Sequence, residues 1–208
     1  MRSYRPTLIA LLIIGLMVTL PLTAEAGRHP HERTGFSIGF NLGAGNSEME
    51  LSLGGLDLTG DRETGGAGNF RLGYAIEQNF LIGLEVSVWT KTYDVEGSLA
   101  DLTVSYGIAG PSVTWFPGNS GFFLRAAVGS GQVDLELSES NLTTTAQESG
   151  FGGLAALGYE WRLTQKFALG AQLDLGYIKI SDVVFGRDDV GDVTVNFANI
   201  TAALNWYW

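Results

Sequence analysis

The sequence predicts an all-β chain that folds as an eight-stranded antiparallel transmembrane β-barrel with short periplasmic turns and longer extracellular loops. Apolar residues alternate with small or polar residues through most of the chain after residue 35, which is the period of a strand with two unlike faces. The 29 glycines, 11% aromatic residues and only 16% charged residues suit strands that turn one face to lipid. Three short turns also alternate with four longer loops, as in barrels whose two ends face different compartments.

The N-terminus predicts a cleaved signal peptide over residues 1–26. Two arginines precede an apolar run over residues 8–20, and Ala24 and Ala26 form a small-x-small cleavage pattern. An uncleaved membrane helix would need about 20 apolar residues. This run is shorter and meets Pro21, so we expect export rather than anchoring by a helix.

Removal of the signal peptide would leave a short periplasmic leader, residues 27–34, and a barrel domain over residues 35–208. The chain has no cysteine, which excludes a disulfide framework, a thiolate metal site and a cysteine nucleophile. The formal net charge of -10 argues against nucleic acid as a partner.

The first predicted strand covers residues 36–45, where apolar residues alternate with glycine, serine and asparagine. Residues 47–66 are rich in glycine and acidic residues and are predicted as a long loop whose flanks can extend the strands. The clearest hairpin covers residues 67–90, because an alternating apolar face runs into a tight turn at residues 77–79 and then runs back.

Two charged residues, Arg71 and Glu85, fall on the inward face of this hairpin. If the turn is centred on Gln78, they lie directly opposite each other on neighbouring strands. Side chains directly opposite each other on neighbouring antiparallel strands are close enough for a cross-strand ion pair. We expect this pair to have a structural role.

An acidic loop is predicted over residues 91–101, before a strand over residues 102–115. The phase of this strand is open, because Gly110 and Pro111 are typical of a bulge or an edge disturbance. One face carries Val104, Tyr106 and Ile108, and the other carries Val113 and Trp115.

A short turn at residues 117–121 leads into the next strand, in which Arg125 lies among inward glycines and alanines. A third acidic loop, rich in serine and threonine, is predicted over residues 133–150. The following strand, residues 151–161, carries Glu160 on its inward face.

A short turn at residues 164–166 precedes a strand over residues 167–177 with Asp174 inside, and residues 181–191 form the fourth predicted loop. The final strand, residues 192–208, is apolar along one face and ends with Trp206 and Trp208 on that face. Tryptophan in this position suits a membrane interface. The outward aromatic residues are predicted to form one girdle at the short turns and a second toward the loops: Phe36, Phe80, Phe122, Trp161, Phe167, Trp206 and Trp208 in the first, and Tyr106, Phe151 and Tyr177 in the second.

With these features, residues 35–208 resemble the small eight-stranded outer-membrane barrels of Gram-negative bacteria, the group that includes the transmembrane domain of outer membrane protein A. Members typically end in an aromatic residue within a strand that the assembly machinery recognises, and Trp206 and Trp208 match that signal with tryptophan as the last residue. The resemblance implies location in the cell outer membrane, contact with outer-membrane lipid and lipopolysaccharide, and insertion by the assembly machinery. We expect a monomer.

Several outer-membrane barrels are enzymes that rely on a histidine general base. Both histidines here, His29 and His31, precede the first strand, so we expect no enzyme activity, no cofactor and no catalytic or metal site on the barrel. The charged inward residues are instead predicted to fill the barrel as an ion-pair network. Its predicted members are Arg71, Glu85, Arg125, Glu160 and Asp174.

The function predicted from these features is structural or interactive, with acidic loops that either bind cations or a basic partner, or form a solvated surface. A passive conduit for small or apolar solutes is an alternative. A soluble periplasmic lipocalin-like binder, with the apolar faces turned inward, is a second alternative. A separate hypothesis concerns the mature N-terminus, because Gly27-Arg28-His29 would offer a square-planar ligand set for Cu(II) or Ni(II).

Overall fold

The computed structural model describes residues 33–53, 56–94, 100–139, 142–185 and 188–208. The predicted signal peptide, the copper hypothesis at Gly27-Arg28-His29 and residues 27–32 of the predicted leader lie outside the described residues. Within the described part of the chain, no helix is long and apolar enough to span a bilayer.

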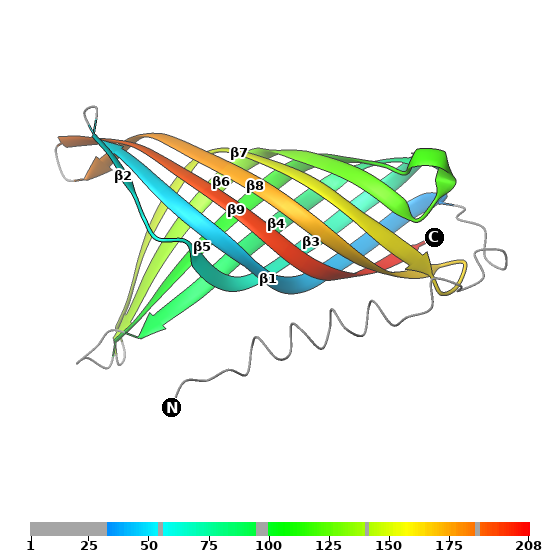
Figure 1. Cartoon of the computed structure of the whole chain (residues 1–208), viewed down its shortest axis with the longest axis horizontal. Coiled ribbons are helices and arrows are strands. Elements are labelled where there is room, and N and C mark those ends of the chain that lie inside the picture. Colours follow the sequence, from blue (N-terminus) through cyan, green and yellow to red (C-terminus); the bar gives the residue numbers. More distant parts are fainter. Residues whose placement is uncertain (1–32, 54–55, 95–99, 140–141, 186–187) are drawn as a thin grey trace. The chain divides into compact units, whose positions relative to one another are not determined.

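Nine antiparallel strands form one sheet, and pairing of the first long strand with the last closes it into a barrel (Figure 1). Eight long strands make up the barrel wall, while the short β2 pairs with the outer end of β1. The strands are β1 Gly35–Leu53, β2 Leu56–Thr59, β3 Glu63–Glu77, β4 Phe80–Asp94, β5 Ala100–Trp115, β6 Phe122–Glu139, β7 Leu142–Arg162, β8 Phe167–Phe185 and β9 Asp188–Tyr207, with a 3-10 turn η1 at Pro117–Asn119. The predicted fold class of eight barrel strands is therefore confirmed.

The short turns follow β3, β5 and β7, as the sequence predicts, but most of each predicted long loop is strand. In place of the predicted loop over residues 133–150, β6 continues to Glu139 and β7 begins at Leu142. The reason is that Val133 and Leu135 continue the inward apolar pattern while acidic and hydroxyl residues alternate on the other face. The strands stay paired beyond the predicted loop boundaries in two groups, β4 to β7 and β8, β9, β1 and β2, so the hairpins extend the barrel wall (Figure 1).

The phase of β5 is continuous through Gly110 and Pro111, because the register with β4 does not shift there. Pro111 falls where the pairing between β5 and β6 is interrupted, which suits a residue without a backbone N–H. Trp115 consequently faces outward, and Tyr106 lies inside with 5% of its surface exposed. The prediction that Tyr106 belongs to an outer aromatic girdle is wrong.

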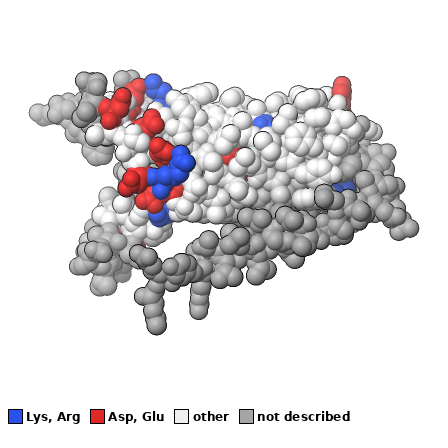
Figure 2. Space-filling view, viewed as in Figure 1, with Lys and Arg blue, Asp and Glu red and all other residues white. Residues whose placement is uncertain are grey.

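The outer surface is an apolar band. Large side chains at alternate positions are exposed as predicted, among them Phe36, Leu42, Leu84, Val128 and Ile200. Figure 2 shows that charged side chains gather at the hairpin end of the barrel, with few charges along the middle of the visible wall. The lipocalin-like alternative is wrong, because it requires these apolar faces to point inward.

The interior has an apolar layer toward the hairpins and a polar layer toward the short turns. Trp89 is the centre of the apolar layer: its ring is fully buried, stacks on Tyr106 with ring centroids 5.1 Å apart, and donates a hydrogen bond from Nε1 to the carbonyl of Gly45 (3.0 Å). The apolar core here comprises Ala67, Trp89, Val104, Tyr106, Ile108, Ala127, Val133, Leu154, Ala156, Ile178, Ile180, Val195 and Phe197. This packed layer crosses the lumen near the hairpins.

Candidate functional site in the barrel interior

All five charged residues predicted to face inward do so. Strand alternation places their neighbours on the lipid face, and Glu85, Arg125, Glu160 and Asp174 are buried while Arg71 is half-buried. A charged side chain inside a barrel needs a partner, because removing a charge from water is costly. The contacts of these five side chains define the candidate site.

Arg71 and Glu85 occupy the predicted register directly opposite each other on β3 and β4, yet they do not form the predicted ion pair. Glu85 Oε2 lies 3.0 Å from Nε of Arg125, which comes from β6. Arg71 instead donates from Nη2 to the side-chain oxygen of Asn205 on β9, at 2.8 Å. Inward side chains of a narrow barrel converge near its axis, so the nearest partner can come from a strand that is not adjacent.

Arg125 connects carboxylates from two sides of the lumen. Besides Glu85, it lies 3.4 Å from Asp174 and donates to the amide oxygen of Gln172 at 2.7 Å. Gln172 in turn donates to both oxygens of Asp174 at 2.8 Å, and Asn69 donates to Glu85 at 3.0 Å. This central cluster joins β3, β4, β6 and β8.

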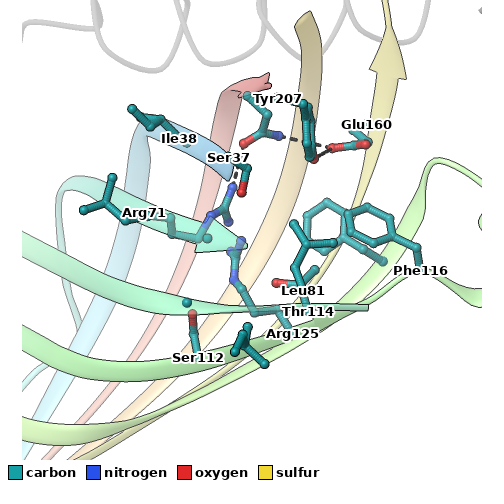
Figure 3. Close-up of a pocket in the computed structure, with 17 residues that line it drawn as sticks. Ser37, Ile38, Arg71, Leu81, Ser112, Thr114, Phe116, Arg125, Glu160 and Tyr207 are labelled. Atoms are coloured by element: carbon teal, nitrogen blue, oxygen red, sulfur yellow. Dashed lines mark hydrogen bonds between the residues drawn. The ribbon is translucent and has the colours of Figure 1, made fainter. Parts of the chain in front are cut away.

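Glu160 is the centre of a second cluster near the short turns. It accepts from Tyr207 at 2.7 Å and from Nε and Nη2 of Arg33 at 2.9 and 2.7 Å. Arg162 lies 3.6 Å from the same carboxylate, and Asn205 donates to it at 3.4 Å. Figure 3 shows the Tyr207 hydroxyl directed at Glu160 beside the ring of Phe116.

Arg33 is the functional residue that the sequence analysis missed. It precedes β1, within the predicted leader, but its side chain is fully buried. Beyond Glu160 it donates to the carbonyl of Ser120 at 2.9 Å, and its guanidinium lies 3.3 Å from the ring centroid of Phe116. A longer contact of 3.5 Å reaches the carbonyl of Gln78. One side chain thus joins the β3–β4 turn, the β5–β6 turn and β7 at the short-turn mouth of the barrel.

Arg71 links the two clusters. Its Nη2 contacts Asn205, which belongs to the Glu160 cluster, and its Nη1 lies 3.4 Å from Gln172 of the central cluster. Polar contacts therefore run without interruption from Arg33 at the mouth to Glu85 beneath the apolar layer. Each of the three buried carboxylates, Glu85, Glu160 and Asp174, contacts an arginine from another part of the chain.

The hairpin end carries an excess of acidic residues. The cations described there lie in ion pairs with acids: Arg62 with Glu48 at 2.9 Å, Lys179 with Asp192 at 2.9 Å, and Lys91 with Glu63. Exposed pairs of this kind stabilise the fold little. No group of three or more histidine, cysteine, aspartate or glutamate side chains that could hold a metal ion is present in the described residues.

A closed antiparallel barrel of eight strands, apolar outside and filled inside, defines the class of small transmembrane barrels. The chain matches the family described as outer membrane protein beta-barrel domain over residues 9–207, and it belongs to this family. It is accordingly a protein of the cell outer membrane, as predicted. A comparison with curated protein sequences finds no match.

Solved structures with the same fold include Ail and Neisserial surface protein A. Ail, the attachment invasion locus protein of Yersinia pestis, is 14% identical with a TM-score of 0.52, and the match covers 83% of this chain and 99% of Ail. Neisserial surface protein A is 15% identical with a TM-score of 0.53, over 84% of this chain and 98% of that chain. The outer membrane protease OmpT from Escherichia coli matches more weakly, with 9% identity and a TM-score of 0.41 over 84% of this chain and 97% of that chain. At these identities the matches to Ail and Neisserial surface protein A show the fold alone.

Proposed function

We propose that this protein is a non-enzymatic structural or surface-interaction protein of the outer membrane, whose filled barrel anchors acidic hairpins outside the cell. The observation that carries the proposal is that the lumen is occupied at both levels. The apolar layer around Trp89 lies toward the hairpins, and the ionic clusters around Arg125 and Glu160 lie toward the short turns.

The small free volume inside the barrel favours a role as an anchor over a role as a conduit. Among the pockets described, the one inside the polar layer has a volume of about 30 Å³, whereas pockets that hold small organic molecules measure about 300–1,000 Å³. Passage of a solute would require displacement of Trp89 as well as separation of the Arg125 ion pairs. A passive conduit for small or apolar solutes remains the alternative to be tested.

The absence of catalytic chemistry is part of the proposal. The described residues contain neither histidine nor cysteine, and the three buried carboxylates are engaged with arginines rather than free for proton transfer. The Arg71, Glu85, Arg125, Glu160 and Asp174 network is therefore assigned a structural role, with Arg33 added to it.

The hairpins are assigned the interaction role. Their acidic character favours cations or a basic partner over a polyanion. Ail has been solved with the heparin analogue sucrose octasulfate, and we do not extend that binding to this chain because acidic hairpins would repel a sulfated ligand. Divalent cations that bridge the hairpins to lipopolysaccharide phosphates fit the charge.

The ends of the barrel complete the proposal. Trp208 is exposed and Trp206 lies on the same outward face, packed against Phe167 and Phe40. We assign both tryptophans to the terminal signal read by the assembly machinery. Among the described strands, the eight of the barrel wall are closed by the β1–β9 pairing and only the four-residue β2 has a single neighbour, so the proposed state is a monomer among outer-membrane lipids.

Complementation of cells that lack the protein tests this proposal. The cells would receive either the wild type or a variant with four neutralised hairpin acids, Glu48→Gln, Glu50→Gln, Asp134→Asn and Glu136→Gln, with Glu77→Gln at the periplasmic turn as the control. A surface role predicts that resistance of the envelope to detergent is restored by the wild type and the control but not by the neutralised variant. Equal restoration by all three, together with loss of uptake of an apolar solute in the deleted cells, would favour the conduit.

A further inference from the structure

We propose that the small cavity between Arg71 and Arg125 binds a small inorganic anion, with chloride as the physiological ligand. The cavity has a volume of about 30 Å³, and its lining includes both guanidinium groups and the hydroxyl residues Ser37, Ser112 and Thr114. Figure 3 shows the two arginine side chains reaching into this space from β3 and β6. Guanidinium and hydroxyl donors directed at one space are the groups that recognise an anion.

The charges of the polar layer favour an anion there. In the described interior between the short turns and the Trp89 layer, the arginines are Arg33, Arg71, Arg125 and Arg162, and the carboxylates are Glu85, Glu160 and Asp174. One positive charge is left without a negative counterpart inside a membrane-embedded barrel. A bound monovalent anion would neutralise this layer and remove the cost of a buried excess charge.

Arg71 is the arginine with room for this ligand. Within the described residues, Arg33 and Arg162 share Glu160, and Arg125 contacts Glu85 and Asp174. The hydrogen bonds of Arg71 go instead to neutral amide oxygens, of Gln172 and Asn205. Those two bonds use Nη1 and Nη2, whereas a guanidinium carries five N–H donors.

The size of the cavity selects the ligand. A cavity of this volume holds a water-sized sphere, so a monatomic anion such as chloride or bromide fits it. Glycines leave room for the lining side chains: a Cβ on Gly73 would lie 2.6 Å from the Ser37 hydroxyl oxygen, and one on Gly39 would lie 2.8 Å from Nη2 of Arg71. Glu160 also lines the cavity, but its carboxylate is engaged with Arg33, Arg162 and Tyr207.

The anion can be tested by its effect on stability. The wild-type barrel would be refolded from urea into detergent micelles in sodium chloride, bromide or gluconate at equal ionic strength, so that the anion is present while the barrel closes. A ligand that binds the folded state stabilises it in proportion to the logarithm of its concentration over its Kd. We expect a higher urea midpoint in chloride and bromide than in gluconate, and a midpoint difference that is lost in Arg71→Gln and kept in Lys166→Gln, which removes an exposed cation.

Equal wild-type midpoints in chloride and gluconate would overturn the proposal, as would the same anion difference in Arg71→Gln. If Arg71→Gln does not fold, wild-type crystals grown in sodium bromide decide the question. An anomalous bromide peak between Arg71 and Arg125 supports the site, and peaks confined to the outer surface of the protein overturn it.

Discussion

Substitution of Arg33 by methionine is expected to destabilise the barrel although this residue lies outside every strand. Methionine keeps much of the aliphatic length and removes the donors that reach Glu160, Ser120 and the ring of Phe116. Loss of one partner from a buried ion pair costs about 3–5 kcal/mol. Because Tyr207 and Arg162 still contact Glu160, we expect a loss at the lower end, about 3 kcal/mol.

Urea unfolding in detergent micelles, followed by tryptophan fluorescence and by heat-modifiable gel migration, measures this loss. Thr34→Ala is the matched control, because Thr34 is the exposed neighbour of Arg33, and a surface change of this kind shifts stability by about 0.5 kcal/mol or less. The double variant Arg33→Met with Glu160→Gln should recover part of the loss, since the carboxylate is no longer left short of a cation. An Arg33→Met variant as stable as Thr34→Ala would refute the assignment of Arg33 to the interior network.

Three further substitutions test other levels of the barrel, each by its urea midpoint. Trp89→Ala removes the centre of the apolar layer and should cost about 3–5 kcal/mol, against a smaller loss for the lipid-facing Trp161→Ala; equal losses would contradict the packed layer. Arg125→Met leaves two buried carboxylates without their shared cation and should cost about 3–5 kcal/mol, so a change under 1 kcal/mol would count against the central cluster. Leu84→Arg puts a charge on the lipid face and should lower the free energy of unfolding by about 2–4 kcal/mol. Thr103→Arg, which lies outward on a hairpin, should leave it nearly unchanged. Similar losses for the two variants would contradict the position assumed here for the bilayer.

Periodicity was enough to predict the faces of the barrel wall. The apolar side chains from Phe36 to Leu42 and from Phe70 to Ile76 are the exposed ones, because a period of two assigns every residue of a strand once one residue is placed. The register of Arg71 with Glu85 agrees with the predicted turn centre at Gln78, although the structure reaches it through a register shift between Ala75 and Glu77 next to the turn.

Contacts across the lumen were not predictable from that pattern. The ion pair of Glu85 with Arg125 joins two strands separated by a third, and alternation gives no distance between such strands. Arg33 has no periodic neighbours, so the pattern carries no signal for it. Alternation predicts that Trp89, between Val88 and Thr90, faces inward. It does not predict an apolar layer, because such a layer is visible only when the inward positions of all strands are compared.

The proposed anchoring function requires a closed lumen, and electrical conductance of the wild-type protein in planar bilayers measures that property. The Trp89 layer and the ionic clusters predict a baseline without long-lived open levels, and they predict that Trp89→Ala introduces conductance events while Trp161→Ala does not. Stable, discrete openings of the wild type would contradict the closed lumen and would identify the barrel as a conduit.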